Sequence, residues 1–158
     1  MVKKKKIEKV AVVGGGFMGI QIGIVAAKFG GNTVKICDVS QAAFERARKI
    51  EEALLSSQVA TGRISEQDKA GIKRKIAFFS ELPAALADAD LVIEAVPEVL
   101  KTKRRVFAEL DRLAPADAIL ATNSSSIPVS RMEDVTRRPE KVVNIIFARP
   151  SSRKTSRT

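Results

Sequence analysis

The stretch KVAVVGGGFMGIQIG, residues 9–23, decides how this chain folds. Its first five residues are a short apolar run that predicts a buried strand, and the spacing behind the glycines predicts a helix over residues 18–29. Gly14, Gly16 and Gly19 fit the pattern G-x-G-x-x-G at this strand-to-helix junction. The first glycine permits a tight turn, the second leaves the backbone bare, and the third lets the helix pack closely on the strand. A helix N-terminus at that point attracts a pyrophosphate, which predicts a dinucleotide-binding site.

Apolar runs and helical patterns alternate along the rest of the chain. Further strands are expected over residues 33–37, 91–96, 118–123 and 142–147, with a weaker one over 76–79, and further helices over 41–60, 66–75 and 102–113. Ser40 and Ser65 are predicted N-caps, and Asp68 makes an approximate capping box with Ser65. Near-continuous apolar strands joined by helices predict an α/β fold, a Rossmann-type, doubly wound, mostly parallel sheet with helices on both faces. We expect this domain to span residues 1–148, followed by a basic, disordered tail over 149–158.

The composition indicates which kinds of partner and which cellular location to expect. The formal charge is +10, but much of the excess lies near the two ends, and the chain has no Trp or Tyr, so no nucleic-acid partner is expected. The apolar runs are too short to cross a bilayer and no signal-peptide pattern opens the sequence, so we expect a cytoplasmic protein without a membrane partner. Cys37 is the only cysteine, and we interpret it as a small buried side chain and expect no metal site.

An acidic residue follows the second predicted strand. Asp38 stands nineteen residues after Gly19, where a carboxylate accepts hydrogen bonds from the adenine ribose hydroxyls and repels a 2′-phosphate. No arginine occupies the next turn, residues 39–41, so NAD is preferred to NADP as the cofactor. A turn residue or a helix-start acid is the alternative interpretation of Asp38.

DLVIEAVPE (90–98), followed by K..VF.ELD (103–111) and then ATNSSS (121–126), is more specific than the glycine pattern, and VKICDVSQAAFERA (34–47) adds to these blocks. Together with the glycine turn they make nearly the whole chain similar to the N-terminal NAD-binding domain of the L-3-hydroxyacyl-CoA dehydrogenases of fatty-acid β-oxidation, including the 3-hydroxybutyryl-CoA dehydrogenases.

This resemblance implies roles for individual residues. The cofactor-binding residues expected from it and from the glycine turn are Gly14, Gly16, Phe17, Met18, Gly19, Asp38, Ala95, Val96, Glu98, Lys103, Asn123 and Ser125. Of these, Glu98 and Lys103 would lie beside the nicotinamide ribose, while Asn123 and Ser125 would hydrogen-bond the substrate oxygen and the cofactor. The alternatives are solvated helix-start charges for the first pair and a helix cap for the second.

The chain departs from the family pattern at the last strand. The family has His-Phe-Phe-Asn-Pro there, with the histidine as general base, whereas this chain has Ile146 at the histidine position and no histidine at all. No Asp or Glu follows Glu140 to orient such a base. We also expect the family's helical C-terminal domain to be absent, and hypothesise a truncated, out-of-frame, degenerate or excised gene product.

The sequence thus predicts an NAD-dependent 3-hydroxyacyl-CoA dehydrogenase by descent, present as its cofactor-binding domain and inactive alone. The alternatives are a non-catalytic NAD-binding module or partner subunit, and a basic scaffold with no ligand. Acyl-CoA contacts are expected to be weakened, because Ala53 and Ala60 stand where the family has polar or basic residues. A homodimer is the expected form of self-association.

Overall fold

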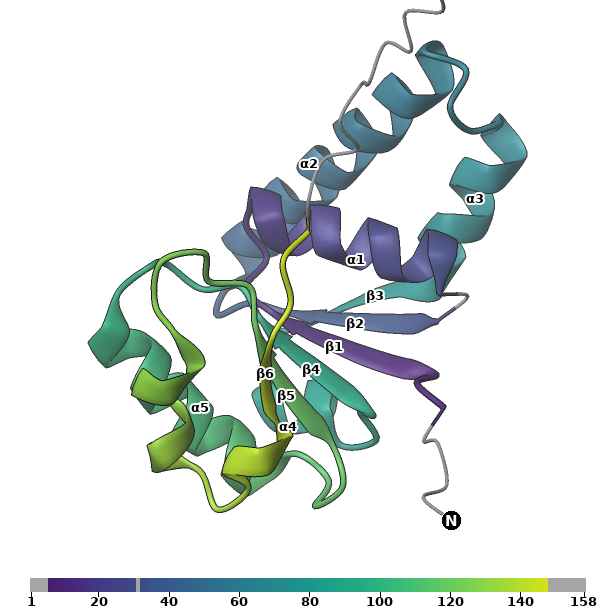
Figure 1. The fold of residues 1–158 in the computed structure, drawn as a ribbon. Helices are drawn as coiled ribbons and strands as arrows, with labels where there is room; N and C mark the ends of the chain where they lie inside the picture. Colours follow the sequence, from purple (N-terminus) through teal and green to yellow (C-terminus); the bar gives the residue numbers. More distant parts are fainter. Residues whose placement is uncertain (1–5, 31, 148–158) are drawn as a thin grey trace, which may run out of the picture.

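The computed structural model describes residues 6–30 and 32–147, which form a six-stranded sheet with helices on both faces (Figure 1). The strands are β1 (Lys9–Val13), β2 (Thr33–Cys37), β3 (Ile76–Phe79), β4 (Leu91–Glu94), β5 (Ile119–Thr122) and β6 (Val142–Asn144). Their order across the sheet is β3-β2-β1-β4-β5-β6, and every pair is parallel. The chain moves outward from β1 on one side and then returns to β4 on the other, so the predicted doubly wound fold is confirmed.

Helices cover the two faces in separate groups. They are α1 (Phe17–Phe29), α2 (Gln41–Ala60), α3 (Glu66–Lys75), α4 (Leu82–Leu86) and α5 (Leu100–Leu113). The first three cover one face, and α4 and α5 cover the other, together with three 3₁₀ turns between β5 and β6 (Figure 1). Alternation along β1 sends Val10 and Val12 into the first core and Ala11 and Val13 into the second. The central strand is therefore buried on both sides.

The strand register brings four strand ends to one edge of the sheet. Val13, the last residue of β1, pairs with Cys37 on β2 and with Glu94 on β4, and Glu94 pairs with Thr122 on β5. The loops that follow these ends lie at the point where strand order reverses between β1 and β4. In open α/β sheets this is where ligands bind.

Local signals placed most helix ends correctly. The Ser40 hydroxyl accepts a hydrogen bond from the Ala43 N–H at 3.2 Å, and Ser65 and Asp68 form a reciprocal capping box at the start of α3. The short helix α4 was not predicted, because LPAAL is too brief to show a helical period.

Three strands end earlier than expected, and β4 shows the reason. It ends at Glu94 instead of Val96, because the Glu94 carboxylate accepts the Val96 N–H at 2.7 Å and turns the chain out of the sheet. The predicted tail over residues 149–158 lies outside the described residues.

Candidate functional site

The turn between β1 and α1 needs glycine at two positions for steric reasons. Gly14 has a φ of 115°, in the left-handed region, and a Cβ there would lie 2.6 Å from the Ala95 carbonyl oxygen. A Cβ on Gly19 would lie 1.8 Å from the Gly14 carbonyl oxygen. These two glycines therefore shape the turn and let α1 and the β4 loop close onto it.

Gly16 is different, because a Cβ there would meet no atom within 4 Å. It is the N-cap of α1, where no side chain caps the helix and no acidic residue lies in the first turn. Phe17 and Met18 follow it with exposed side chains. The first N–H groups of the helix have no partner within the helix and carry its positive partial charge. Bare backbone, open space and free N–H groups fit the diphosphate expected from the sequence.

Asp38 is fixed at the end of β2 by two backbone groups. Its Oδ2 accepts the Gly15 N–H at 2.8 Å, and its Oδ1 accepts the Val39 N–H at 2.6 Å. A carboxylate has about four acceptor positions, so two remain for ligand hydroxyls. The side chain is half-buried, which leaves it accessible from the cleft described next.

These features open into a cleft of about 910 Å³ between the glycine turn, the ends of β2 and β4, and α5. Pockets that hold small molecules and cofactors span roughly 300–1,000 Å³. The expected cofactor-binding residues line this cleft, with two exceptions: Gly19 is buried behind the turn, and Ser125 is exposed outside the lining. The structure thus brings the expected residues together, and their contacts with a cofactor stay a prediction.

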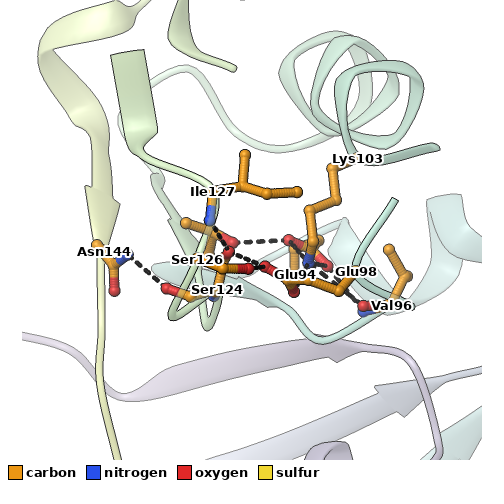
Figure 2. A network of polar contacts seen from close by, with 9 residues as sticks. Glu94, Val96, Glu98, Lys103, Ser124, Ser126, Ile127 and Asn144 are labelled. Carbon is orange, nitrogen blue, oxygen red and sulfur yellow. Dashed lines mark hydrogen bonds and ion pairs between the residues drawn. The ribbon is translucent and has the colours of Figure 1, made fainter. Parts of the chain in front are cut away.

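A buried ion pair supports the side of the cleft formed by β4 and α5 (Figure 2). Lys103 is 1% exposed and Glu94 is 0% exposed. The Lys103 ammonium donates to Glu94 Oε1 at 2.7 Å and to Oε2 at 3.0 Å. The same carboxylate accepts the Val96 N–H at 2.7 Å and the Thr122 hydroxyl at 2.8 Å. Buried charges require this degree of pairing, because their loss of hydration is otherwise uncompensated.

Glu98 extends this network to the rim of the cleft. Its Oε1 accepts hydrogen bonds from the hydroxyls of Ser124 and Ser126, the latter at 2.9 Å, and its Oε2 lies 3.3 Å from the Lys103 ammonium. Partial burial acts to raise the pKa of Glu98, but the two serine hydroxyls and the ammonium outweigh it, so the pKa lies below its usual value. Glu98 is therefore an anion at neutral pH.

The loop after β5 is anchored on both sides of Ser125. The Asn123 N–H donates to the Glu94 carbonyl at 3.1 Å, and the Ser124 hydroxyl accepts the Ile127 N–H at 2.8 Å. From β6, the Asn144 amide donates to the Ser124 carbonyl at 2.7 Å (Figure 2). Ser125 itself is exposed at this fixed loop, beside the end of the strand that leads to residue 146.

Ile146 stands two residues beyond β6 with 71% of its surface exposed. It carries no group that can exchange a proton. The described residues also contain no group of three or more His, Cys, Asp or Glu side chains that could hold a metal ion, and no helix long and apolar enough to cross a membrane. Cys37 lines the cleft as a buried thiol, and burial raises its pKa to about 11.

Sequence reasoning missed the centre of the polar network. Glu94, Thr122 and Ser124 were not predicted to have a role. The signal for Glu94 was present, since it is the one charge in the apolar run LVIEAV and a lysine follows nine residues later. A carboxylate in a buried strand needs a cationic partner, and one on the next helix can supply it.

Comparisons with known proteins agree with this geometry. Residues 9–153 match the family model of the 3-hydroxyacyl-CoA dehydrogenase NAD-binding domain. The chain is 35% identical over 145 residues to the 3-hydroxyadipyl-CoA dehydrogenase of Escherichia coli, covering 92% of this chain and 30% of that protein. It is also 35% identical to the 3-hydroxybutyryl-CoA dehydrogenase of Mycobacterium tuberculosis, covering 91% of this chain and 50% of that protein.

Among solved structures, M. tuberculosis FadB2 superimposes with a TM-score of 0.87 at 35% identity, over 92% of this chain and 51% of that one. The chain thus spans about a third to a half of the length of these relatives. The matching family model describes a domain that binds NAD, which confirms the cofactor expected from Asp38. The glycine turn, the acidic residue after β2 and the match over residues 9–153 lead to one conclusion: this chain belongs to the family of 3-hydroxyacyl-CoA dehydrogenase NAD-binding domains.

Proposed function

We propose that the chain is the NAD-binding part of an NAD-dependent dehydrogenase that oxidises 3-hydroxyacyl-CoA to 3-oxoacyl-CoA. The observation that carries the proposal is the single cleft, which joins a diphosphate cradle at Gly16 to the anchored polar loop at Asn123. The relatives with these folds are named for acting on 3-hydroxyacyl-CoA compounds.

Each part of the cleft has a distinct task in this proposal. The N–H groups at Gly16 bind the diphosphate, Asp38 holds the adenine ribose, and Glu98 accepts a hydrogen bond from the nicotinamide ribose at the opposite end. When NAD is bound, it accepts a hydride from the carbon that carries the substrate hydroxyl. Asn123 and Ser125 orient the substrate oxygen from the loop after β5, and Ala95 and Val96 cover the cofactor beside the glycine turn.

These 158 residues by themselves are proposed to bind NAD(H) with at most trace turnover. They contain no histidine or tyrosine to take the hydroxyl proton, and the exposed Ile146 stands where the family resemblance places the base. A missing general base costs about 10²- to 10⁴-fold in rate.

The same observation favours one other candidate function, a non-catalytic NAD-binding module or partner subunit. Such a module would bind the dinucleotide equally well, since Ile146 leaves the diphosphate cradle unchanged. A partner that supplies a base would separate a catalytic role, alone or as a partner subunit, from a non-catalytic module, because the non-catalytic module would gain no turnover.

Acyl-CoA binding, the metabolic role and the oligomeric state rest on the sequence and on the family resemblance. Acyl-CoA binds weakly to this chain, because Ala53 and Ala60 on α2 are exposed and offer no polar group. The role in fatty-acid β-oxidation, the homodimer and the cytoplasmic location stay predictions of the sequence and of the family resemblance.

The test is a fluorescence titration with NADH, followed by an assay of acetoacetyl-CoA reduction. Binding with no more than trace turnover is the expected result. Gly16→Val should abolish NADH binding without unfolding the chain, because its side chain enters open space where the diphosphate would lie. Gly71→Val is the matched control, since Gly71 is on α3, away from the cleft, with only the end of Arg74 near its Cβ position. Equal NADH affinity in both variants would refute the proposed site, and turnover near that of an intact dehydrogenase would refute the proposed inactivity.

A further inference from the structure

Lys103 lies at the cleft, yet its ammonium has no hydrogen left to give a ligand. It donates to both oxygens of Glu94, at 2.7 and 3.0 Å, and to the Val96 carbonyl at 3.3 Å, and it lies 3.3 Å from Glu98 Oε2. An ammonium has three N–H donors, so these partners saturate it. A cofactor could recruit Lys103 only by displacing one of them inside a site that is 1% exposed.

Glu94 sets this arrangement although it does not line the cleft. It is fully buried, and its carboxylate binds Lys103 on α5, Thr122 on β5 and the Val96 N–H in its own turn. Four hydrogen bonds satisfy the acceptor positions of a carboxylate. Glu94 therefore fixes the end of β4, the start of α5 and the end of β5 relative to one another.

Two paths lead from Glu94 to the surface of the cleft. In the first, Lys103 pairs with both Glu94 and Glu98, and the Glu98 carboxylate accepts hydrogen bonds from the hydroxyls of Ser124 and Ser126 (Figure 2). In the second, the Thr122 hydroxyl donates to Glu94, and its oxygen accepts the Ser124 N–H at 3.1 Å, so Glu94 is connected to the same loop. Both paths end at the part of the cleft that Glu98 and Asn123 line.

We propose that Glu94 is a positioning residue: through Lys103 and Thr122 it holds Glu98 and the loop after β5 in place for the nicotinamide half of the dinucleotide. Among the described residues the Glu94 carboxylate makes no hydrogen bond to Gly16 or Asp38, so the adenosine diphosphate half depends on it less. This inference rests on the proposed function. It changes the role expected for Lys103 from a direct ligand of the nicotinamide ribose to a link between two carboxylates.

The test compares two ligands, NADH and ADP, because ADP lacks the nicotinamide half. Glu94→Gln keeps the shape of the side chain but removes the charge that holds Lys103, so NADH affinity should fall by about tenfold or more, corresponding to about 1.4 kcal/mol. ADP affinity should change by less than about twofold, since groups that share no contact usually act independently to within about 0.5 kcal/mol. The ratio of the two affinities is the readout, because a general loss of stability does not change it.

Three further variants guard against misfolding. Thr122→Val should lower the ratio of NADH affinity to ADP affinity. Thr122→Ser should keep this ratio at the value of the native chain, because serine keeps the hydroxyl that binds Glu94. Asp111→Asn is the matched control: Asp111 is a buried carboxylate paired with Arg137 and Arg138 outside the cleft, so this variant should lose stability at an unchanged ratio.

The outcomes separate the inference from the proposed function. If the native chain binds neither ADP nor NADH, the proposed function is wrong and the inference falls with it. If the native chain binds both and Glu94→Gln or Thr122→Val leaves the ratio unchanged, the inference alone is wrong. The same conclusion holds if ADP binding falls as far as NADH binding in a folded Glu94→Gln variant.

Discussion

Glu51 and Glu52 are neighbours on α2, yet their carboxyl groups lie in opposite environments. Glu51 is 4% exposed, and its Oε1 has no hydrogen-bond partner among the described residues. Burial raises its pKa above the ordinary value of 4.5, a nearby Glu52 adds to the shift, and the charges of Lys73 and Arg48 oppose it. Glu51 therefore destabilises the fold when it is ionised.

Replacing Glu51 by Met, which is similar in length and has no charge, should stabilise the protein. A buried polar group without a partner costs about 1–3 kcal/mol. For a chain of this size 1 kcal/mol shifts the melting temperature by about 2–4 °C, so the expected rise is roughly 2–12 °C at pH 7. Thermal unfolding followed by circular dichroism measures it.

The pH dependence of this gain has a defined sign. Because the folded pKa of Glu51 is raised, the stability that this group contributes is fully present below about pH 4.5 and is lost as the pH rises through the folded value. The advantage of Glu51→Met should therefore grow from pH 4.5 towards neutral pH. A melting temperature at or below that of the native chain at pH 7 would contradict the reasoning.

Glu52 provides the internal control. Lys69 and Lys73 bind it, and hydrogen bonds from these lysines and from Ser56 lower its pKa to about 2. Its contribution is therefore present above about pH 4.5 and lost as the pH falls through about 2, so Glu52→Gln should destabilise the protein at pH 7, and this loss should shrink as the pH falls towards 2. The two variants should change stability in opposite directions.

Three other expectations follow from the packing. Gly19→Ala should lower the free energy of unfolding by more than about 4 kcal/mol, because the new methyl group meets the Gly14 carbonyl oxygen at 1.8 Å; an unchanged urea midpoint would show that α1 can move away. Arg138→Met should cost about 3–5 kcal/mol in urea unfolding, since it removes the buried guanidinium at 2.7 Å from Asp111 and leaves only the largely exposed Arg137 to pair with that carboxylate; a loss below about 1 kcal/mol would mean that Arg137 compensates. Cys37 should react with a disulfide reagent at pH 8 only after unfolding, because its thiol is buried with a pKa of about 11; rapid labelling of the folded protein would disprove this.

Much of the fold was predictable because its strands are uniform. KVAVV and TVKIC have the apolar, β-branched character of strands buried on both faces, and their bounds were predicted to the residue. The serine caps at Ser40 and Ser65 act through local backbone bonds, so they too can be read from sequence. The glycine turn was equally clear, because Gly14 and Gly19 answer local steric demands and Gly16 leaves open space at the start of α1.

The polar network was not predictable to the same degree, because tertiary contacts determine it. From the sequence Lys103 is expected beside the nicotinamide ribose or, alternatively, as a solvated helix-start charge, and only the fold places Glu94 of β4 against it. Ser124 and Ser125 have the same side chain, yet Ser124 is buried and its hydroxyl is hydrogen-bonded, whereas Ser125 is exposed. Only the geometry of the loop determines which serine stabilises the fold and which is accessible to a ligand.

The central position of β1 has a consequence for how the protein is made. β1 pairs with β2 soon after it in the chain, but its other neighbour, β4, begins only at Leu91. A ribosome releases the N-terminal segments first, so the glycine turn emerges long before the carbonyl of Ala95 that packs against it. The dinucleotide cradle thus stays incomplete until Ala95 has been synthesised and β4 has docked beside β1, and only then can the cofactor stabilise the nascent chain.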